Sequence, residues 1–409
     1  MPLINPGLLT INPVSSKRVA KQAKANPAIL NLSMGEPDFG PPPWLVEAIC
    51  QNDLRPERFL DAAKRYEDTL GSLSLREAIA LWYQNRYGLC IDPQREILIT
   101  HGAIEAVNLA LLTLTKPGEA VALATPTYTL YQRAVALMGR CLAPFERKMT
   151  DLPYIDGLAA LKARHAALLI NSPENPTGYV LSDLDWQNLT QYCQTGDQWL
   201  IHDEVYDTLA FGRDHRNAWC FPELRDRSVL INSCSKKLGM PGLRIGWLIG
   251  PANVIQAAGQ VHESLCLGVS ILNEPIAERL LRDPEIMSWM DSQCLMVKNR
   301  AQRALACLGS IQGFEWQHHP MGGLFLFPAV HRLYTRLPRQ YREKDNNPGC
   351  AVAAWLMDEL KIATVPGVAY GPQCSHHLRI ALGSSDQVFE AALERLMALV
   401  LAKGASHDA

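Results

Sequence analysis

The sequence lacks any apolar run long enough to cross a bilayer, and its first residues have neither the basic nor the apolar region of a signal peptide. Its eleven cysteines include no Cys-x-x-Cys pair, and the adjacent pairs His318 and His319, and His376 and His377, lack further ligands at metal spacing. The formal net charge is only −2, so no strong field attracts nucleic acid or a membrane. We therefore expect a cytoplasmic protein with free thiols, no metal site, and no nucleic-acid or membrane partner.

A Gly-x-Gly-x-x-Gly turn after a predicted strand is also absent, which disfavours a dinucleotide enzyme. Short apolar runs do recur, at 96–100, 120–124, 166–170, 198–201, 229–231 and 245–249, and stretches with helical periodicity separate them. This alternation predicts an α/β fold with a mostly parallel sheet. The 409 residues, 48% of them hydrophobic, are enough for two cores. Residues 332–349, which are basic and contain proline, are predicted to form a surface connection.

One lysine stands directly after a predicted buried strand. Residues 233–246 read Ser-Cys-Ser-Lys-Lys-Leu-Gly-Met-Pro-Gly-Leu-Arg-Ile-Gly, so Lys236 follows the strand at 229–231. A desolvated lysine loses its proton more easily, and its amine can then attack a carbonyl to form a Schiff base. Ser233 and Arg244 offer a hydroxyl and a bidentate cation, which suit a phosphate. The alternative is a solvated loop lysine beside a serine that starts a helix.

Polar residues follow other predicted strands as well. Gly102 lies between the strand at 96–100 and an apolar helix, an arrangement that aims backbone N–H groups at an anion. Asp203 follows the strand at 198–201, the turn at 171–178 reads Asn-Ser-Pro-Glu-Asn-Pro-Thr-Gly, and Arg379 lies in the apolar stretch 378–382. Each has a plainer alternative: a common glycine turn, a solvated loop carboxylate, an Asn-Pro turn without function, and an exposed strand arginine.

Three of these segments occur in an order that resembles a known family. They are the turn at 171–178, the Asp-Glu-Val-Tyr of 203–206, and the Ser-x-Ser-Lys with its following Gly-x-Arg-x-Gly at 233–246. Together they resemble the signature of fold-type I enzymes that use pyridoxal 5′-phosphate (PLP), and more narrowly the class I and II aminotransferases. The resemblance extends over roughly residues 30–400.

The resemblance implies a role in cofactor binding for each matching residue. Lys236 would hold PLP as a Schiff base and move the substrate's α-proton. Asp203 would pair with the protonated pyridine nitrogen, which keeps the ring an electron sink. Tyr128 would stack on the ring, and Asn175 and Tyr206 would hydrogen-bond its phenolic oxygen. The phosphate would be bound by Gly102, Ala103, Ile104, Ser233 and Arg244, and by Tyr66 from a partner subunit.

The resemblance also implies contacts with the substrate. Arg379 would bind the α-carboxylate through its planar fork, a geometry that lysine cannot copy. Gly35 would let the backbone approach that carboxylate, and Asn175 would lie beside it. No arginine for a second carboxylate is evident, so the identity of the substrate stays open.

The expected protein is therefore a PLP-dependent aminotransferase that moves an amino group between an amino acid and a 2-oxo acid. A PLP-dependent lyase, cyclase or oxidase acting on an amino-acid-derived metabolite stays open, because the same residues serve those reactions. Residues 1–44 would form an arm and part of the small domain, residues 45–285 the large PLP domain, and residues 286–409 the rest of a smaller α+β domain. The family is usually a homodimer with shared active sites, and we expect the same here.

Overall fold

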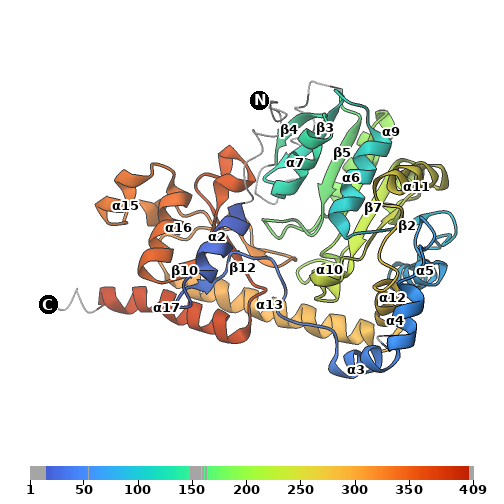
Figure 1. Cartoon of the computed structure of the whole chain (residues 1–409). Helices are drawn as coiled ribbons and strands as arrows, with labels where there is room; N and C mark the ends of the chain where they lie inside the picture. The colour runs from blue at the N-terminus through green and yellow to red at the C-terminus, as the bar shows by residue number, and fades with distance from the viewer. Residues whose placement is uncertain (1–14, 54, 148–157, 159–160, 162–163, 405–409) are drawn as a thin grey trace, which may run out of the picture.

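The computed structural model describes residues 15–404, except residues 54, 148–157, 159–160 and 162–163. Two regions lie side by side, with the central sheet in one and the chain's C-terminal helices in the other (Figure 1). None of the described helices combines the length and the apolar character that crossing a membrane requires.

Within the described residues, the central sheet has seven strands in the order β2-β8-β7-β6-β5-β3-β4. Strand β8 is antiparallel to both of its neighbours, and the other pairs are parallel. The predicted α/β fold with a mostly parallel sheet is thus confirmed. The strands are β2 (Ile97–Thr100), β3 (Ala120–Thr125), β4 (Cys141–Glu146), β5 (Ala167–Asn171), β6 (Trp199–Asp203), β7 (Ser228–Ser233) and β8 (Gly246–Ile249).

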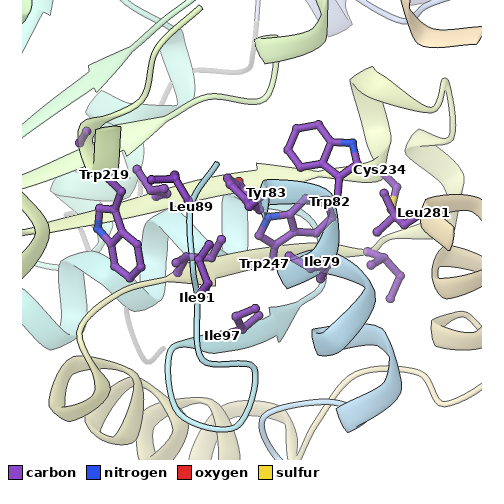
Figure 2. Packing of buried hydrophobic residues seen from close by; sticks show 14 of the residues in the cluster. Ile79, Trp82, Tyr83, Leu89, Ile91, Ile97, Trp219, Cys234, Trp247 and Leu281 are labelled. Atoms are coloured by element: carbon purple, nitrogen blue, oxygen red, sulfur yellow. Dashed lines mark hydrogen bonds between the residues drawn. The ribbon is translucent and has the colours of Figure 1, made fainter. Parts of the chain in front are cut away.

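Residues along each buried strand alternate between two cores, one on each face of the sheet. In β7, Val229 and Ile231 join the core beneath α6 (Ala103–Leu114), α7 (Thr129–Leu137) and α11 (Ala252–Cys266). Leu230 joins the opposite core with α5 (Leu73–Tyr87), α9 (Asp183–Thr195) and α12 (Glu274–Arg282). Figure 2 shows Tyr83 of α5 and Trp247 of β8 packed in this second core. Because both faces are covered, the strands read as continuous apolar runs in the sequence.

A separate core forms around the C-terminal part of the chain. The long helix α13 (Ile286–Ser310) contributes Met290 to a core of the large sheet and Val297 to this one, so it joins the two regions. A three-stranded sheet, β11-β12-β9, lies here, and β1 pairs in parallel with β10. These strands are β1 (Leu30–Asn31), β9 (Phe325–Leu326), β10 (Ile362–Ala363), β11 (Val365–Pro366) and β12 (Leu378–Ala381).

The remaining helices connect or cover these sheets. They are α2 (Ser15–Lys24), α3 (Pro43–Asn52), α4 (Pro56–Ala62), α10 (Cys234–Lys237), α14 (His331–Tyr334), α15 (Arg339–Lys344), α16 (Pro348–Glu359) and α17 (Asp386–Gly404). Short 3-10 helices are η1 (Asp207–Leu209), η2 (Ala218–Cys220), η3 (Pro222–Arg227), η4 (Pro241–Leu243), η5 (Gly367–Tyr370) and η6 (Pro372–Cys374). The domain limits near residues 45 and 285 stay a prediction.

The surface connection predicted for residues 332–349 is wrong. This segment contains most of α14, all of α15 and the start of α16. Leu333, Leu337 and Tyr341 are buried in the C-terminal core. Their apolar side chains are spaced along a strongly basic segment, and the arginines around them stay exposed. The basic composition of this segment reflects its exposed side, and only the tertiary structure showed that its apolar side chains are buried.

Candidate active site

Parallel strands bring the predicted site residues to one edge of the central sheet. Asn171 at the end of β5 lies opposite Asp203 at the end of β6, and Ser233 ends the next strand, β7. Helix α10 starts directly after Ser233 and carries Lys236. A cavity of ≈ 440 Å³ opens at this edge. Ligand sites in open α/β sheets lie outside the carboxyl ends of the strands, so this cavity is the candidate active site.

Lys236 projects into the cavity from α10. Its Nζ donates a hydrogen bond to the backbone oxygen of Gly35 at 2.6 Å. Burial lowers the pKa of Lys236 to about 8, an effect that nearby Glu36 opposes and Arg379 reinforces. At pH 7 about a tenth of this amine is therefore neutral, which is the form that a nucleophile or a base requires.

The neighbouring lysine points elsewhere. Lys237 is fully buried, and its Nζ lies 3.1 Å from Asp207 Oδ2 and 3.4 Å from the centre of the Trp82 ring. Successive residues of a helix point in different directions, so only one of two adjacent lysines can face the cavity. Among the described residues, Lys236 lines the cavity and Lys237 does not.

Asp203 forms the buried acidic end of the cavity. Burial raises the pKa of its carboxyl group to about 6. Two hydrogen bonds oppose this shift, because they favour the ionised form: the Tyr131 hydroxyl donates to Oδ2 at 2.6 Å, and the Val205 amide donates to Oδ1 at 3.1 Å. Tyr131 was not among the predicted site residues. Its position three residues after Tyr128, on the first turn of α7, was the available signal.

The end of the cavity beside the N-terminus of α6 is suited to hold an anion. Gly102 adopts φ +79 as the N-cap of α6, so the first residues of that helix, Ala103 and Ile104, meet the cavity. This positive φ favours glycine, and a Cβ there would also lie 2.5 Å from Nη2 of Arg244. Arg244 itself has a left-handed backbone, φ 53, and donates from Nη2 to the carbonyl of His101 at 2.9 Å. The helix N-terminus and the guanidinium together favour a phosphate.

Ser233 lines the same end of the cavity. Its Oγ accepts a hydrogen bond from the Ser235 amide at 3.3 Å, which leaves the hydroxyl hydrogen as a donor. The predicted phosphate residues of this chain are thus brought together. Tyr66 is different: it is 85% exposed and does not belong to the described lining of this chain's cavity.

A buried guanidinium closes the substrate side of the cavity. Arg379 on β12 is only 3% exposed, which contradicts the alternative of an exposed strand arginine. Its Nη1 donates to Asn175 Oδ1 at 3.2 Å and its Nη2 to the Ser33 carbonyl at 2.6 Å. Its Nε is buried and has no hydrogen-bond partner among the described residues. Buried donors are nearly always paired, so this N–H is suited to an acceptor supplied by a ligand.

Gly35 and two tyrosines complete the lining. A Cβ on Gly35 would lie 2.3 Å from Cζ of Phe325, so a larger residue would not fit between the backbone and that ring. Tyr128 and Tyr206 both line the cavity, and the Tyr206 ring meets Phe325 edge-on with centroids 5.9 Å apart. The described residues therefore fit PLP with an amino acid: an anion cradle, a buried carboxylate, a partly neutral amine and a guanidinium surround one cavity.

Asn175 is held in place by a residue that the sequence analysis did not assign to the site. The Asn175 amide donates to Asn171 Oδ1 at 2.8 Å, and Asn171 Nδ2 donates to the Asp203 carbonyl at 2.9 Å. Asn171 thereby links the turn at 171–178 to the end of β6. Its place as the first residue of that turn was the signal in the sequence.

Comparison with known proteins gives a consistent result. The family model described as "Aminotransferase class I and II" matches residues 27–396. The chain is 27% identical to an arginine–pyruvate transaminase of Pseudomonas aeruginosa, over 89% of this chain and 88% of that protein. It is 28% identical to an aspartate aminotransferase of Streptomyces avermitilis, over 92% and 90% of the two chains.

A solved structure shows the same fold. The aspartate aminotransferase from Thermus thermophilus with maleate superposes with a TM-score of 0.85. The match covers 98% of this chain and 100% of that chain at 23% identity. At this identity the likeness concerns the fold alone.

Proposed function

Because this chain belongs to the class I and II aminotransferases, which are PLP-dependent transferases, we propose that Lys236 is its cofactor lysine and Arg379 its carboxylate-binding residue. The observation that carries this proposal is the shared cavity. Lys236, with its partly neutral amine, and Arg379 both line this one space, at the end of the strand that carries Asp203. An amine beside a carboxylate site is what amino-group transfer from an amino acid requires.

PLP, when bound, supplies an electron sink that stabilises negative charge on the substrate's α-carbon. The residues of this chain then have separate tasks. Asp203 supplies the negative charge that pairs with the ring nitrogen, and the hydrogen bond from Tyr131 favours its ionised form. Lys236 accepts and returns the α-proton, a task suited to an amine with a pKa near 8.

The phosphate end positions the cofactor without taking part in proton transfer. The N-terminal turn of α6, with Ala103 and Ile104, and the side chains of Ser233 and Arg244 would bind the phosphate. Tyr128 would stack on the ring, and Asn175 and Tyr206 would hydrogen-bond its phenolic oxygen. All of these residues line the same cavity, which supports the assignment.

Arg379 gives the site its preference for carboxylates. Asn175 and Ser33 accept one hydrogen bond each from Nη1 and Nη2, so the guanidinium cannot rotate freely and three of its five N–H donors are left for a ligand. A fixed, charged donor in a buried site discriminates strongly against substrates that lack the acceptor. The same residue would receive the amino acid and then the 2-oxo acid, since both carry this carboxylate.

A homodimer with shared active sites is also part of the proposal. Tyr66 is 85% exposed, and nearby Leu265 and Leu267 are 60% and 52% exposed. A Cβ on Gly268 would come 3.7 Å from the Asp68 carbonyl, so the end of α11 and the loop of Tyr66 lie together. An exposed aromatic beside exposed leucines supports burial against a second copy of the chain.

Subunit complementation tests the shared site. Lys236→Ala and Tyr66→Ala are each expected to be weakly active alone. A mixed dimer carries both changes in one site and neither in the other, so activity should return when subunits exchange. Mixtures without any recovered activity would place Tyr66 outside the partner's site.

A cytoplasmic location completes the proposal. All eleven cysteines, each within the described residues, are free thiols. Free thiols persist in a reducing compartment.

The reaction is tested by a product assay of the purified holoenzyme. It is offered each common amino acid, with and without 2-oxoglutarate or pyruvate, and the products are identified by mass spectrometry. We expect a 2-oxo acid and a new amino acid in large excess over the enzyme only when both substrates are present. Ammonia or a cyclised product formed without a 2-oxo acid would instead support a lyase or a cyclase.

A further inference from the structure

Four side chains that commonly bind metals gather beside the phosphate end of the cavity but outside its described lining. They come as two pairs, each with a spacing of four residues: one pair spans the turn before α6 and its first turn, and the other lies at the end of α11. One nitrogen, oxygen or sulfur atom of each lies within 4.8 Å of the others. We name this group the α6–α11 cluster, and its members are His101, Glu105, His262 and Cys266.

His262 points an unpaired nitrogen into the cluster. Its side chain is fully buried, and its Nδ1 lies 2.9 Å from the carbonyl oxygen of Thr69. A carbonyl only accepts, so Nδ1 carries a hydrogen, and Nε2 is the ring nitrogen left to face a ligand. Nε2 has no hydrogen-bond partner within the part of the chain that the structure describes. A ring fixed through one nitrogen, with the other directed at its neighbours, is the usual state of a metal-binding histidine.

Glu105 lies between the other members. Its Oε2 accepts a hydrogen bond from the backbone amide of His101 at 2.5 Å and lies 3.0 Å from the Nδ1 of that residue. The same oxygen is 3.7 Å from Nε2 of His262, and Oε1 is 3.5 Å from the sulfur of Cys266. These hydrogen bonds position the carboxylate, but the buried Nε2 of His262, 3.7 Å from Glu105, has no hydrogen bond to any described residue.

We propose that the α6–α11 cluster binds one Zn²⁺ ion. Two imidazoles, a carboxylate and a thiolate are zinc ligands, and the thiolate disfavours magnesium or calcium. Tetrahedral coordination at roughly 2.0–2.3 Å places ligand atoms about 3.3–3.8 Å apart, so the observed cluster needs to contract only slightly. His101 and Cys266 are partly exposed and have room to adjust. The ion would also balance the charge of the carboxylate and the thiolate.

Zinc in this position would brace the phosphate end of the active site. Gly102, Ala103 and Ile104 lie between two of the ligands, and the carbonyl of His101 accepts a hydrogen bond from Arg244. The Thr69 carbonyl that orients His262 belongs to the loop after Tyr66. The bound ion would therefore act as a positioning element for the cofactor and would not contact the substrate.

The experiment measures metal content and cobalt spectra of untagged holoenzyme. Protein is equilibrated with Zn²⁺ or Co²⁺, passed through metal-free buffer, and analysed by elemental mass spectrometry. Cobalt adds visible d–d bands at wavelengths beyond the cofactor's absorption, and these are intense only in tetrahedral sites. Cys266→Ser and His262→Gln are compared with Cys141→Ser and His319→Gln, whose original side chains are exposed and lie outside the cluster.

The parent and both control variants should retain one ion per chain and show tetrahedral cobalt bands. Cys266→Ser should lose at least ten-fold in zinc affinity, because even indirect supports of such sites are worth ten- to hundred-fold. Cofactor should dissociate more slowly from zinc-loaded parent enzyme than from metal-free enzyme. Parent protein that binds no zinc overturns the proposal, as does Cys266→Ser that binds zinc as tightly as the parent. Cys266→Ser decides the outcome if His262→Gln fails to fold.

Discussion

Replacing Arg379 by lysine separates substrate binding from cofactor binding. Arginine has five N–H donors and lysine has three. In the structure, two donors of Arg379 hold Asn175 and the Ser33 carbonyl, and Nε is buried without a partner among the described residues. A lysine at this position that donated hydrogen bonds to the same two groups would have one donor left for a ligand. The charge would remain, but a forked contact with a carboxylate would be lost.

The expected loss follows from one hydrogen bond to a charged group. Such a bond contributes about 1.5–3 kcal/mol, which corresponds to roughly a ten- to hundred-fold change in a binding constant. Amino-acid binding to Arg379→Lys should weaken by that factor, while PLP stays bound. Arg244→Lys should instead weaken PLP binding, since that guanidinium lies at the phosphate end of the cavity. Arg339→Lys, at a side chain that is 83% exposed, is the neutral control.

The assay is a spectral titration of the holoenzyme with an amino acid and with the matching amine that lacks only the carboxylate. In the parent enzyme the amino acid should bind far more tightly than the amine. Arg379→Lys should reduce this preference, because amine binding never used the guanidinium. The reasoning is refuted if the preference is unchanged, or if Arg379→Lys loses PLP.

Three further outcomes test the cofactor residues. Borohydride reduction of the holoenzyme should attach one pyridoxyl group to Lys236; a peptide map with the label on Lys237, which is buried against Asp207, would contradict the assignment. Burial lowers the pKa of Lys236 to about 8, so the rate at which apoenzyme recombines with PLP should rise with pH through about 8 and then level off; a rise that continues to 10 argues against a nucleophilic Lys236. Tyr131→Phe removes a hydrogen bond that lowers the pKa of Asp203, so that pKa should rise above about 6. Apoenzyme of this variant should therefore lose its affinity for PLP at a higher pH than the parent on acidification, and an identical pH profile would exclude the role given to Tyr131.

The fold followed from the sequence wherever burial was complete. Strands β2, β3 and β5 to β8 are nearly all buried, so each appears as an apolar run. The edge strand β4 was not predicted, because exposed residues alternate with buried ones along it and Pro144 interrupts the run. One face of β4 is left to solvent, so it lacks the continuous apolar run of a strand that is covered on both faces.

The candidate site residues were likewise predicted from short, separate segments of the sequence. The order of the Asn-Pro turn, the acidic strand end and the lysine turn predicted the family, and the local spacing distinguished Lys236 from Lys237. Each of these signals lies within a few residues along the chain, where strand and helix periodicity determine which side chains share a face.

The contacts that position these side chains, by contrast, join segments that are far apart in the sequence. Arg379 meets Ser33, Tyr131 meets Asp203, and the two halves of the α6–α11 cluster meet each other across long separations in sequence. The sequence alone determined the fold class and predicted the candidate reactive groups. Only the tertiary structure decided which donors are paired, which remain buried without a partner, and how far burial shifts a pKa, because desolvation and hydrogen bonding depend on neighbours that the chain brings together only by folding.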